Sequence, residues 1–158
     1  MRLGALATAM ALVTWPCLAD CPIELSVYGG RDDAATLDFH PAQGAAVTNS
    51  FRLVHGETIL DGIVMWSQGV ERPNGVISHQ CPDGDVTGPE YEACTVWQGV
   101  IYAVDASGEI GLLPRAGEAA PARLLFPDLA YAVHAFPAFA DGIAPLSSEV
   151  FTLSGCQE

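Results

Sequence analysis

The sequence contains no lysine, and its six arginines stand against nineteen aspartates and glutamates, which gives a net charge of −13. Binding to nucleic acid or to an anionic lipid surface requires many cations that neutralise phosphates. We therefore expect no nucleic acid and no anionic membrane among the partners. We interpret the excess of acids as a solubility feature, with a cationic partner or bound metal ions as the alternatives.

Motifs of nucleophilic, redox and nucleotide chemistry are also missing. The chain has no Gly-x-Ser-x-Gly, Ser-x-x-Lys or Cys-x-x-Cys pattern and no glycine-rich phosphate loop. The four histidines lack the short spacing of a zinc site, and they are His40, His55, His79 and His134. A small hydrolase using carboxylates and a histidine is the remaining enzymatic hypothesis. It predicts a concave pocket in which a histidine lies within hydrogen-bond reach of an Asp or Glu.

No apolar run reaches the roughly 20 residues that span a bilayer. Residues 3–15 are apolar, follow Arg2 and have the length of a signal-peptide core, and Ala19 is a small residue suited to a cleavage site. We expect residues 1–19 to be a signal peptide and residues 20–158 to form one globular domain in the periplasm or outside the cell. A buried N-terminal helix is the alternative. Because Asp20 precedes Cys21, we expect no lipid-modified cysteine and no membrane anchor after cleavage.

Five cysteines are present, and loss of residues 1–19 would remove Cys17 and leave an even number. An even count in an exported chain predicts disulfides, and four cysteines allow three connectivities. We favour Cys81–Cys94 because the intervening segment is short and rich in turn residues. The remaining pair, Cys21–Cys156, would then tie the start of the domain to its end.

The composition predicts a folded domain, because half of the residues are hydrophobic and only 16% are charged. Short apolar runs separated by Gly, Pro, Asp and Asn predict an α+β, β-rich fold, a mostly antiparallel sheet with two disulfides and one short helix packed on it. The expected strands are Ile23–Tyr28, Thr36–Phe39, Phe51–His55, Thr58–Trp66, Val76–Gln80, Thr95–Val104, Glu109–Leu113 and Val150–Leu153. We also expect turns at Gly29-Gly30, Asn74-Gly75 and Asp141-Gly142.

The segment Thr95–Val104 is apolar on both faces and therefore predicts an interior strand covered on both sides. Asp105-Ala106-Ser107-Gly108 then predicts a turn that closes a hairpin onto Glu109–Leu113.

Residues 127–136 predict the helix. Pro127 suits a first helical position, and Asp128 suits the first turn. An apolar stripe at helical spacing consists of Leu129, Ala132, Val133 and Phe136. His134 falls off this stripe and is expected to be exposed.

The segment between Cys81 and Cys94 is unusually acidic and raises the hypothesis of a calcium loop. Its first half resembles an EF-hand loop in the spacing of Asp83, Asp85, Thr87 and Gly88. Its second half does not, because Cys94 occupies the place of the bidentate Glu. The weak candidate ligands for Ca²⁺ are Asp83, Asp85, Thr87, Glu90 and Glu92. The alternative is a disulfide-closed surface turn with solvated acids, and no other cofactor is expected.

Residues 135–145, AFPAFADGIAP, are apolar and loop-like, so they are the best candidate for a recognition surface. The predicted export signal, the even cysteine count after its removal and the missing catalytic motifs favour an exported, disulfide-stapled protein with a non-catalytic binding or envelope-accessory role. Its partner would be a protein or a small molecule that the sequence leaves unspecified. The carboxylate–histidine hydrolase and the calcium-stabilised module are the alternatives.

Overall fold

The computed structural model describes residues 20–32, 34–42, 44, 46–66, 69, 72–139 and 142–158. The predicted signal peptide, residues 1–19, and Asp141 of one predicted turn lie outside the described residues. Among the described residues, none of the helices combines the length and the apolar character needed to cross a bilayer.

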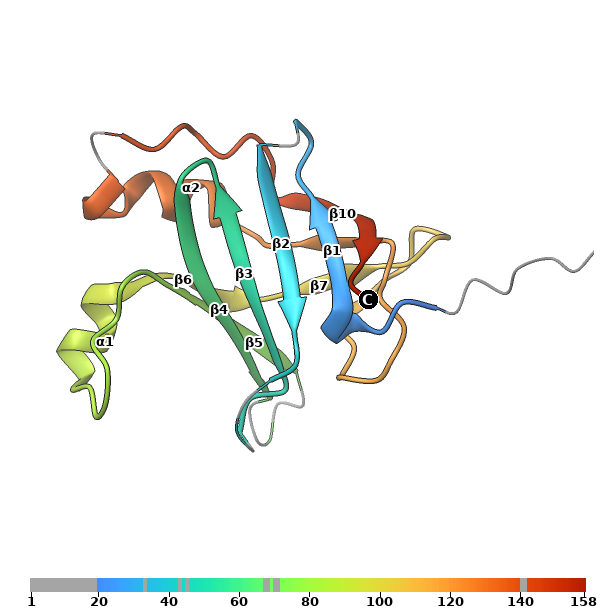
Figure 1. Ribbon diagram of the computed structural model, residues 1–158, viewed down its shortest axis with the longest axis horizontal. Coiled ribbons are helices and arrows are strands. Elements are labelled where there is room, and N and C mark those ends of the chain that lie inside the picture. The colour runs from blue at the N-terminus through green and yellow to red at the C-terminus, as the bar shows by residue number, and fades with distance from the viewer. Residues whose placement is uncertain are drawn as a thin grey trace, which may run out of the picture.

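Ten strands form one sheet in which every neighbouring pair is antiparallel, in the order β6-β5-β4-β3-β2-β1-β10-β9-β7-β8 (Figure 1). This confirms the predicted β-rich fold. The strands are β1 (Ser26–Gly29), β2 (Ala35–His40), β3 (Asn49–His55), β4 (Thr58–Trp66), β5 (Pro73–Ser78), β6 (Thr95–Val100), β7 (Tyr102–Val104), β8 (Ile110–Leu112), β9 (Arg123–Leu125) and β10 (Val150–Cys156).

The sheet curls, because β6 and β7 follow each other in the chain but lie near opposite ends of the strand order. β6 pairs with β5, and β7, which follows it after Ile101, pairs with β9 and β8. The prediction of one uninterrupted strand over Thr95–Val104 was therefore wrong, since the chain changes pairing partners at Ile101. The inward side chains of Trp97, Ile101 and Ala103 are buried, but Tyr102 and Val104 on the other face are only half-buried. The predicted hairpin onto β8 is confirmed, with Gly108 at φ +91°.

A chain of aromatic rings fills the interior of the curled sheet. Ring centroids lie 5.9 Å apart for Tyr28 and Phe39, 5.2 Å for Phe39 and Phe51, and 5.7 Å for Phe51 and Phe126. Phe126 also packs against Trp97 at 5.4 Å. Because these rings come from strands and a loop far apart in the sequence, they join the whole sheet around one core.

The predicted helix is present as α2 (Leu129–Ala135) at one end of the curled sheet (Figure 1). The expected stripe faces the core, with Leu129 and Val133 buried, and His134 is exposed as predicted. The predicted start was wrong. Asp128 is not in the first turn but precedes the helix at φ +62°, and the N–H of Ala130 donates to Glu149 Oε1 at 3.2 Å.

Four short elements were not expected from the sequence. They are η1 (Ile23–Leu25), which replaces the first half of a predicted strand, α1 (Gly88–Cys94), η2 (Pro137–Phe139) and β9. The turn predicted at Asn74-Gly75 was also wrong, because both residues lie inside β5. An added Cβ at Gly75 would lie 2.7 Å from Ile101 Cδ1, so this glycine serves close packing rather than a turn.

Both predicted disulfides are present. Cys21, which precedes β1, is bonded to Cys156 at the end of β10, with Cα atoms 5.8 Å apart, and Cys81 is bonded to Cys94 with Cα atoms 5.2 Å apart. The first therefore fastens the end of β10 to the segment that precedes β1, and the second joins the last residue of α1 to the chain just after β5.

Candidate functional site

The acidic segment between Cys81 and Cys94 is half loop and half helix. Asp83 and Asp85 are exposed in the loop, whereas Glu90 and Glu92 are exposed on α1. The N–H and the hydroxyl of Thr87 both donate to Glu90 Oε2, at 2.9 and 2.7 Å. Thr87 and Glu90, two of the candidate calcium ligands, thus bond to each other and cap the N-terminus of α1. In the part of the chain that the structure describes, no three His, Cys, Asp or Glu side chains are grouped as a metal site would require.

Calcium binding at this loop stays a prediction with a simple test. If the loop binds Ca²⁺, thermal unfolding should occur several degrees higher in millimolar Ca²⁺ than in EDTA, and Asp83→Asn should remove the difference. Equal unfolding temperatures would mean that the loop binds no Ca²⁺ and serves only as a disulfide-closed cap for α1.

The helix cap predicts a pH dependence. The hydrogen bond from the Thr87 hydroxyl, followed by that from its N–H, lowers the pKa of Glu90 below its ordinary value. Because the pKa is lower in the folded than in the unfolded chain, this stabilisation is complete above the unfolded pKa and is lost as the pH falls through the folded one. We expect Thr87→Val to raise the pKa of Glu90 in an NMR titration. An unchanged titration midpoint would contradict this assignment.

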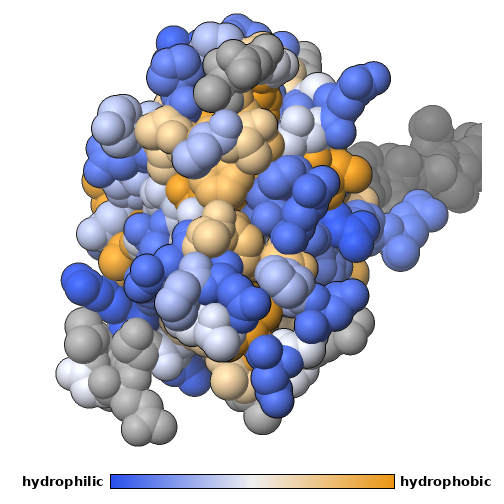
Figure 2. Space-filling view, turned by 90° about the vertical axis from the view of Figure 1, so that its left-hand side faces the viewer, coloured by the Kyte–Doolittle hydropathy of each residue, from blue (hydrophilic) through white to orange (hydrophobic). Residues whose placement is uncertain are grey.

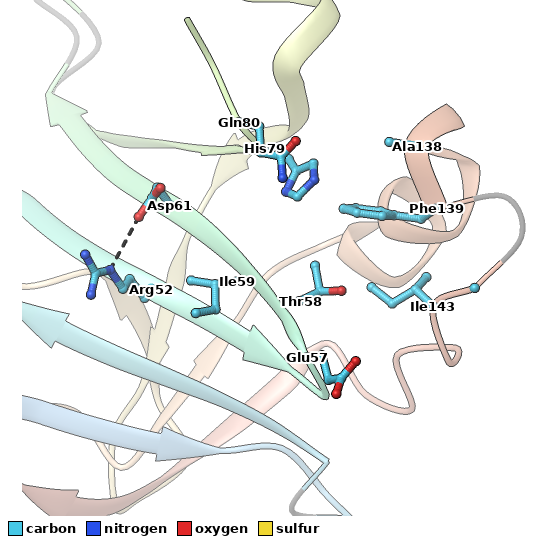
Figure 3. Close-up of a pocket in the computed structure, with 11 residues that line it drawn as sticks. Arg52, Glu57, Thr58, Ile59, Asp61, His79, Gln80, Ala138, Phe139 and Ile143 are labelled. Carbon is cyan, nitrogen blue, oxygen red and sulfur yellow. Dashed lines mark ion pairs between the residues drawn. The ribbon is translucent and has the colours of Figure 1, made fainter. Parts of the chain in front are cut away.

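A cavity of about 700 Å³ opens between the β3–β4 hairpin and η2 (Figure 3). Figure 3 shows His79 and Phe139 side by side at one end of it, with Glu57 at the tip of the hairpin. The described residues that line it are Arg52, Glu57, Thr58, Ile59, Asp61, His79, Gln80, Ala138, Phe139, Gly142 and Ile143. We call this cavity and the hollow next to it the His79 cleft.

The neighbouring hollow, about 330 Å³, shares His79, Gln80 and Ala138 with the first cavity. Its other described walls come from the disulfide segment and from the end of α2, and they are Pro82, Glu90, Ala93, Cys94 and Phe136. The structure therefore brings together two segments that the sequence singled out separately, the acidic disulfide segment and the apolar stretch 135–145. Figure 2, which looks at the side that carries α1 and α2, shows a hydrophobic strip flanked by hydrophilic surface.

His79 lies where the two hollows meet. Its ring packs edge-on against Phe139 and Phe136, with centroids 4.9 and 6.3 Å apart. Its Nδ1 atom is buried and has no hydrogen-bond partner among the described residues. Gln80 follows in a left-handed conformation at φ +50°, a costly backbone state for a residue other than glycine. Buried polar atoms are rarely left unpaired, so a group bound beside this nitrogen would gain a hydrogen bond.

The described lining of the larger cavity has more acidic than basic side chains. Arg52 and Asp61 form an ion pair, Nε to Oδ1, at 3.5 Å, and both side chains are well exposed. Glu57 has no ion pair or hydrogen bond among the described residues. The described lining thus carries one carboxylate that is not balanced by a cation.

His55 holds the far wall of the cleft in place. Its ring is buried, with Nδ1 3.0 Å from the carbonyl oxygen of Ala34 and Nε2 2.7 Å from that of Ala144. A carbonyl only accepts, so the neutral ring makes one of these hydrogen bonds and the doubly protonated ring makes both. Through Ala144, His55 fastens the segment that includes the lining residues Gly142 and Ile143.

We expect His55→Ala to lower the free energy of unfolding by about 2–3 kcal/mol, because it removes a buried side chain together with its hydrogen bonding to the Ala34 and Ala144 carbonyls. Urea unfolding measures this change. Amide exchange of residues 142–146 should also become faster. His40→Ala is the matched control, since among the described residues the His40 ring hydrogen-bonds only to the nearby Asp38 carbonyl, from Nδ1 at 3.4 Å, and its loss should change stability by less than about 0.5 kcal/mol. Equal effects of the two substitutions would contradict the role of His55.

The histidines do not form the pair that the hydrolase hypothesis requires. His40 and His55 contact backbone carbonyls, and in the described chain no hydrogen bond joins a histidine ring to an Asp or Glu side chain. His79 faces aromatic rings instead of a carboxylate that would orient it. The histidine–carboxylate contact that the hydrolase hypothesis predicts is thus not found among the described residues.

No protein-family model, curated protein or solved structure matches this chain.

Sequence reasoning found part of this site. The stretch 135–145 contains Phe136, Phe139 and Ile143, although the two phenylalanines pack on His79 rather than standing exposed together. It missed Glu57, Thr58 and Gln80. Gly56 at φ +59°, between two correctly predicted strands, was the available signal for a hairpin tip that could carry Glu57.

Proposed function

We propose that the protein is an exported, non-catalytic binding protein and that the His79 cleft is its ligand site. The unpaired buried Nδ1 of His79, at the junction of the two hollows, carries this proposal. A cavity of about 700 Å³ has the size of small-molecule sites, and a mostly preformed wall with a few converging polar groups is typical of them.

Export is supported by the two disulfides, since disulfides persist in oxidising compartments. N-terminal sequencing of the protein recovered from its native cells tests export, and we expect the first residue to be Asp20. Recovery of the intact N-terminus from the cytoplasm would overturn export while leaving the cleft unaffected.

The binding proposal is tested with a small-molecule library and amide NMR of the purified, oxidised protein. We expect the bound compounds to shift the signals of His79, Gln80 and Phe139. His79→Ala should abolish these shifts, and His134→Ala should preserve them, because His134 is exposed and does not line the cleft.

Two results would speak against the proposal. Shifts that cluster elsewhere on the molecule would overturn the assignment of the cleft. Turnover of ester, amide or glycoside substrates that is lost in His79→Ala would favour the hydrolase instead.

A further inference from the structure

We propose that the ligand of the His79 cleft is an organic cation, an ammonium or guanidinium group attached to an apolar body. This inference rests on the proposed binding function and adds the chemical class of the ligand. Such a cation is either a small amine or a basic side chain of a protein partner, and the experiment below separates these two sources.

The charged end of the ligand is assigned to Glu57. Arg52, the only arginine in the described lining, is already paired with Asp61 at 3.5 Å. Glu57 is exposed at the hairpin tip and has no partner among the described residues, so its carboxylate is available to accept hydrogen bonds from a cation. Hydrogen bonds to a charged group are stronger than those between neutral groups, and here they cost the protein no existing contact.

The apolar body of the ligand is assigned to the wall opposite. Phe139 and Ile143 line the cavity on that side, and Phe136 continues the aromatic surface into the second hollow. The face of an aromatic ring also attracts a cation, which adds to the preference for a positively charged ligand. The His79 ring beside Phe139 has a buried, unpaired Nδ1 atom, which accepts a further N–H in the tautomer that carries its proton on Nε2.

The electrostatic potential of the whole molecule also favours a cationic ligand. The chain has a net charge of −13 and no lysine, so the potential around it is negative and raises the local concentration of cations. That attraction alone is unspecific and is screened within about 10 Å at 0.1 M salt. The specific part must therefore come from Glu57 and should persist at physiological salt.

The experiment compares three probes of similar shape and different charge at physiological salt, namely phenethylamine, phenethyl alcohol and hydrocinnamate. Binding is followed by amide NMR of the oxidised protein. We expect the amine to bind about tenfold more tightly than the alcohol and the anion to bind least. Glu57→Gln should weaken amine binding to the level of the alcohol.

Glu109→Gln is the matched control, because it removes the same charge from an exposed residue that does not line the cleft. It should leave amine binding unchanged. A blocked Phe-Arg dipeptide distinguishes the sources. Tighter binding of the dipeptide than of phenethylamine supports a basic side chain of a partner, and weaker binding supports a free amine.

Equal binding of amine and alcohol, or full amine binding by Glu57→Gln, would overturn the inference and leave the binding function standing. Failure of the amine to bind would overturn it as well, and the binding function would then be judged on the wider library alone.

Discussion

Gly62→Ala is expected to lower the free energy of unfolding by about 2–3 kcal/mol, a large effect for one added methyl group. Gly62 lies in β4 directly opposite Phe51 of β3, and the added Cβ would overlap three carbon atoms of the Phe51 ring. That ring is fully buried between Phe39 and Phe126, so it has no free space into which it can turn. Urea unfolding of the oxidised protein measures the change.

Two further variants test the cause of this loss. Gly111→Ala adds the same methyl group to another strand glycine, but nothing lies within 4 Å of its Cβ position, so we expect little change. Phe51→Leu removes the ring that the new methyl group meets. The double variant Phe51→Leu/Gly62→Ala should therefore lose less stability than the sum of the two single changes. Simple additivity would show that the overlap with Phe51 is not the cause.

The second large effect is expected from the disulfide that joins the two ends of the domain. Cys21→Ser/Cys156→Ser opens a link with a sequence separation of 135 residues. In the chain-entropy account, the unfolded chain gains entropy without this link, and the free energy of unfolding falls by about 5 kcal/mol. Strain in the folded protein and residual structure in the unfolded chain reduce the measured value. Since a typical domain is stable by 5–15 kcal/mol, such a loss can bring the protein close to unfolding at ordinary temperatures.

Cys81→Ser/Cys94→Ser provides the matched comparison. Its link spans only 13 residues and the same account gives about 3 kcal/mol. Cys94 also lines the second hollow, so this variant should disturb ligand binding more than the Cys21–Cys156 variant does when both are measured under folding conditions. A smaller loss of stability from the long link than from the short one would contradict the entropic ordering.

Much of the fold follows from local patterns in the sequence. β4 was predicted over the residues it occupies, and β2 and β3 to within two residues, because alternating apolar side chains and turn residues act over a few positions. The start of α2 was missed because the N–H of Ala130 in its first turn is satisfied by Glu149, a residue about twenty positions away that no local rule could identify. α1 was missed because its capping box, Thr87 with Glu90, was interpreted as part of a calcium loop.

The sequence by itself determined the β-rich class, both disulfides and the buried stripe of α2, since each depends on residue spacing or on counting cysteines. Only the tertiary structure decided that the sheet curls through Thr95–Val104 and that His79, Glu57 and Phe139 border one cleft. These residues stand on different elements, and their meeting depends on strand order and on contacts such as that of His55 with Ala144. Local propensity carries no information about such distant pairings, because they are fixed by the packing of one shared core.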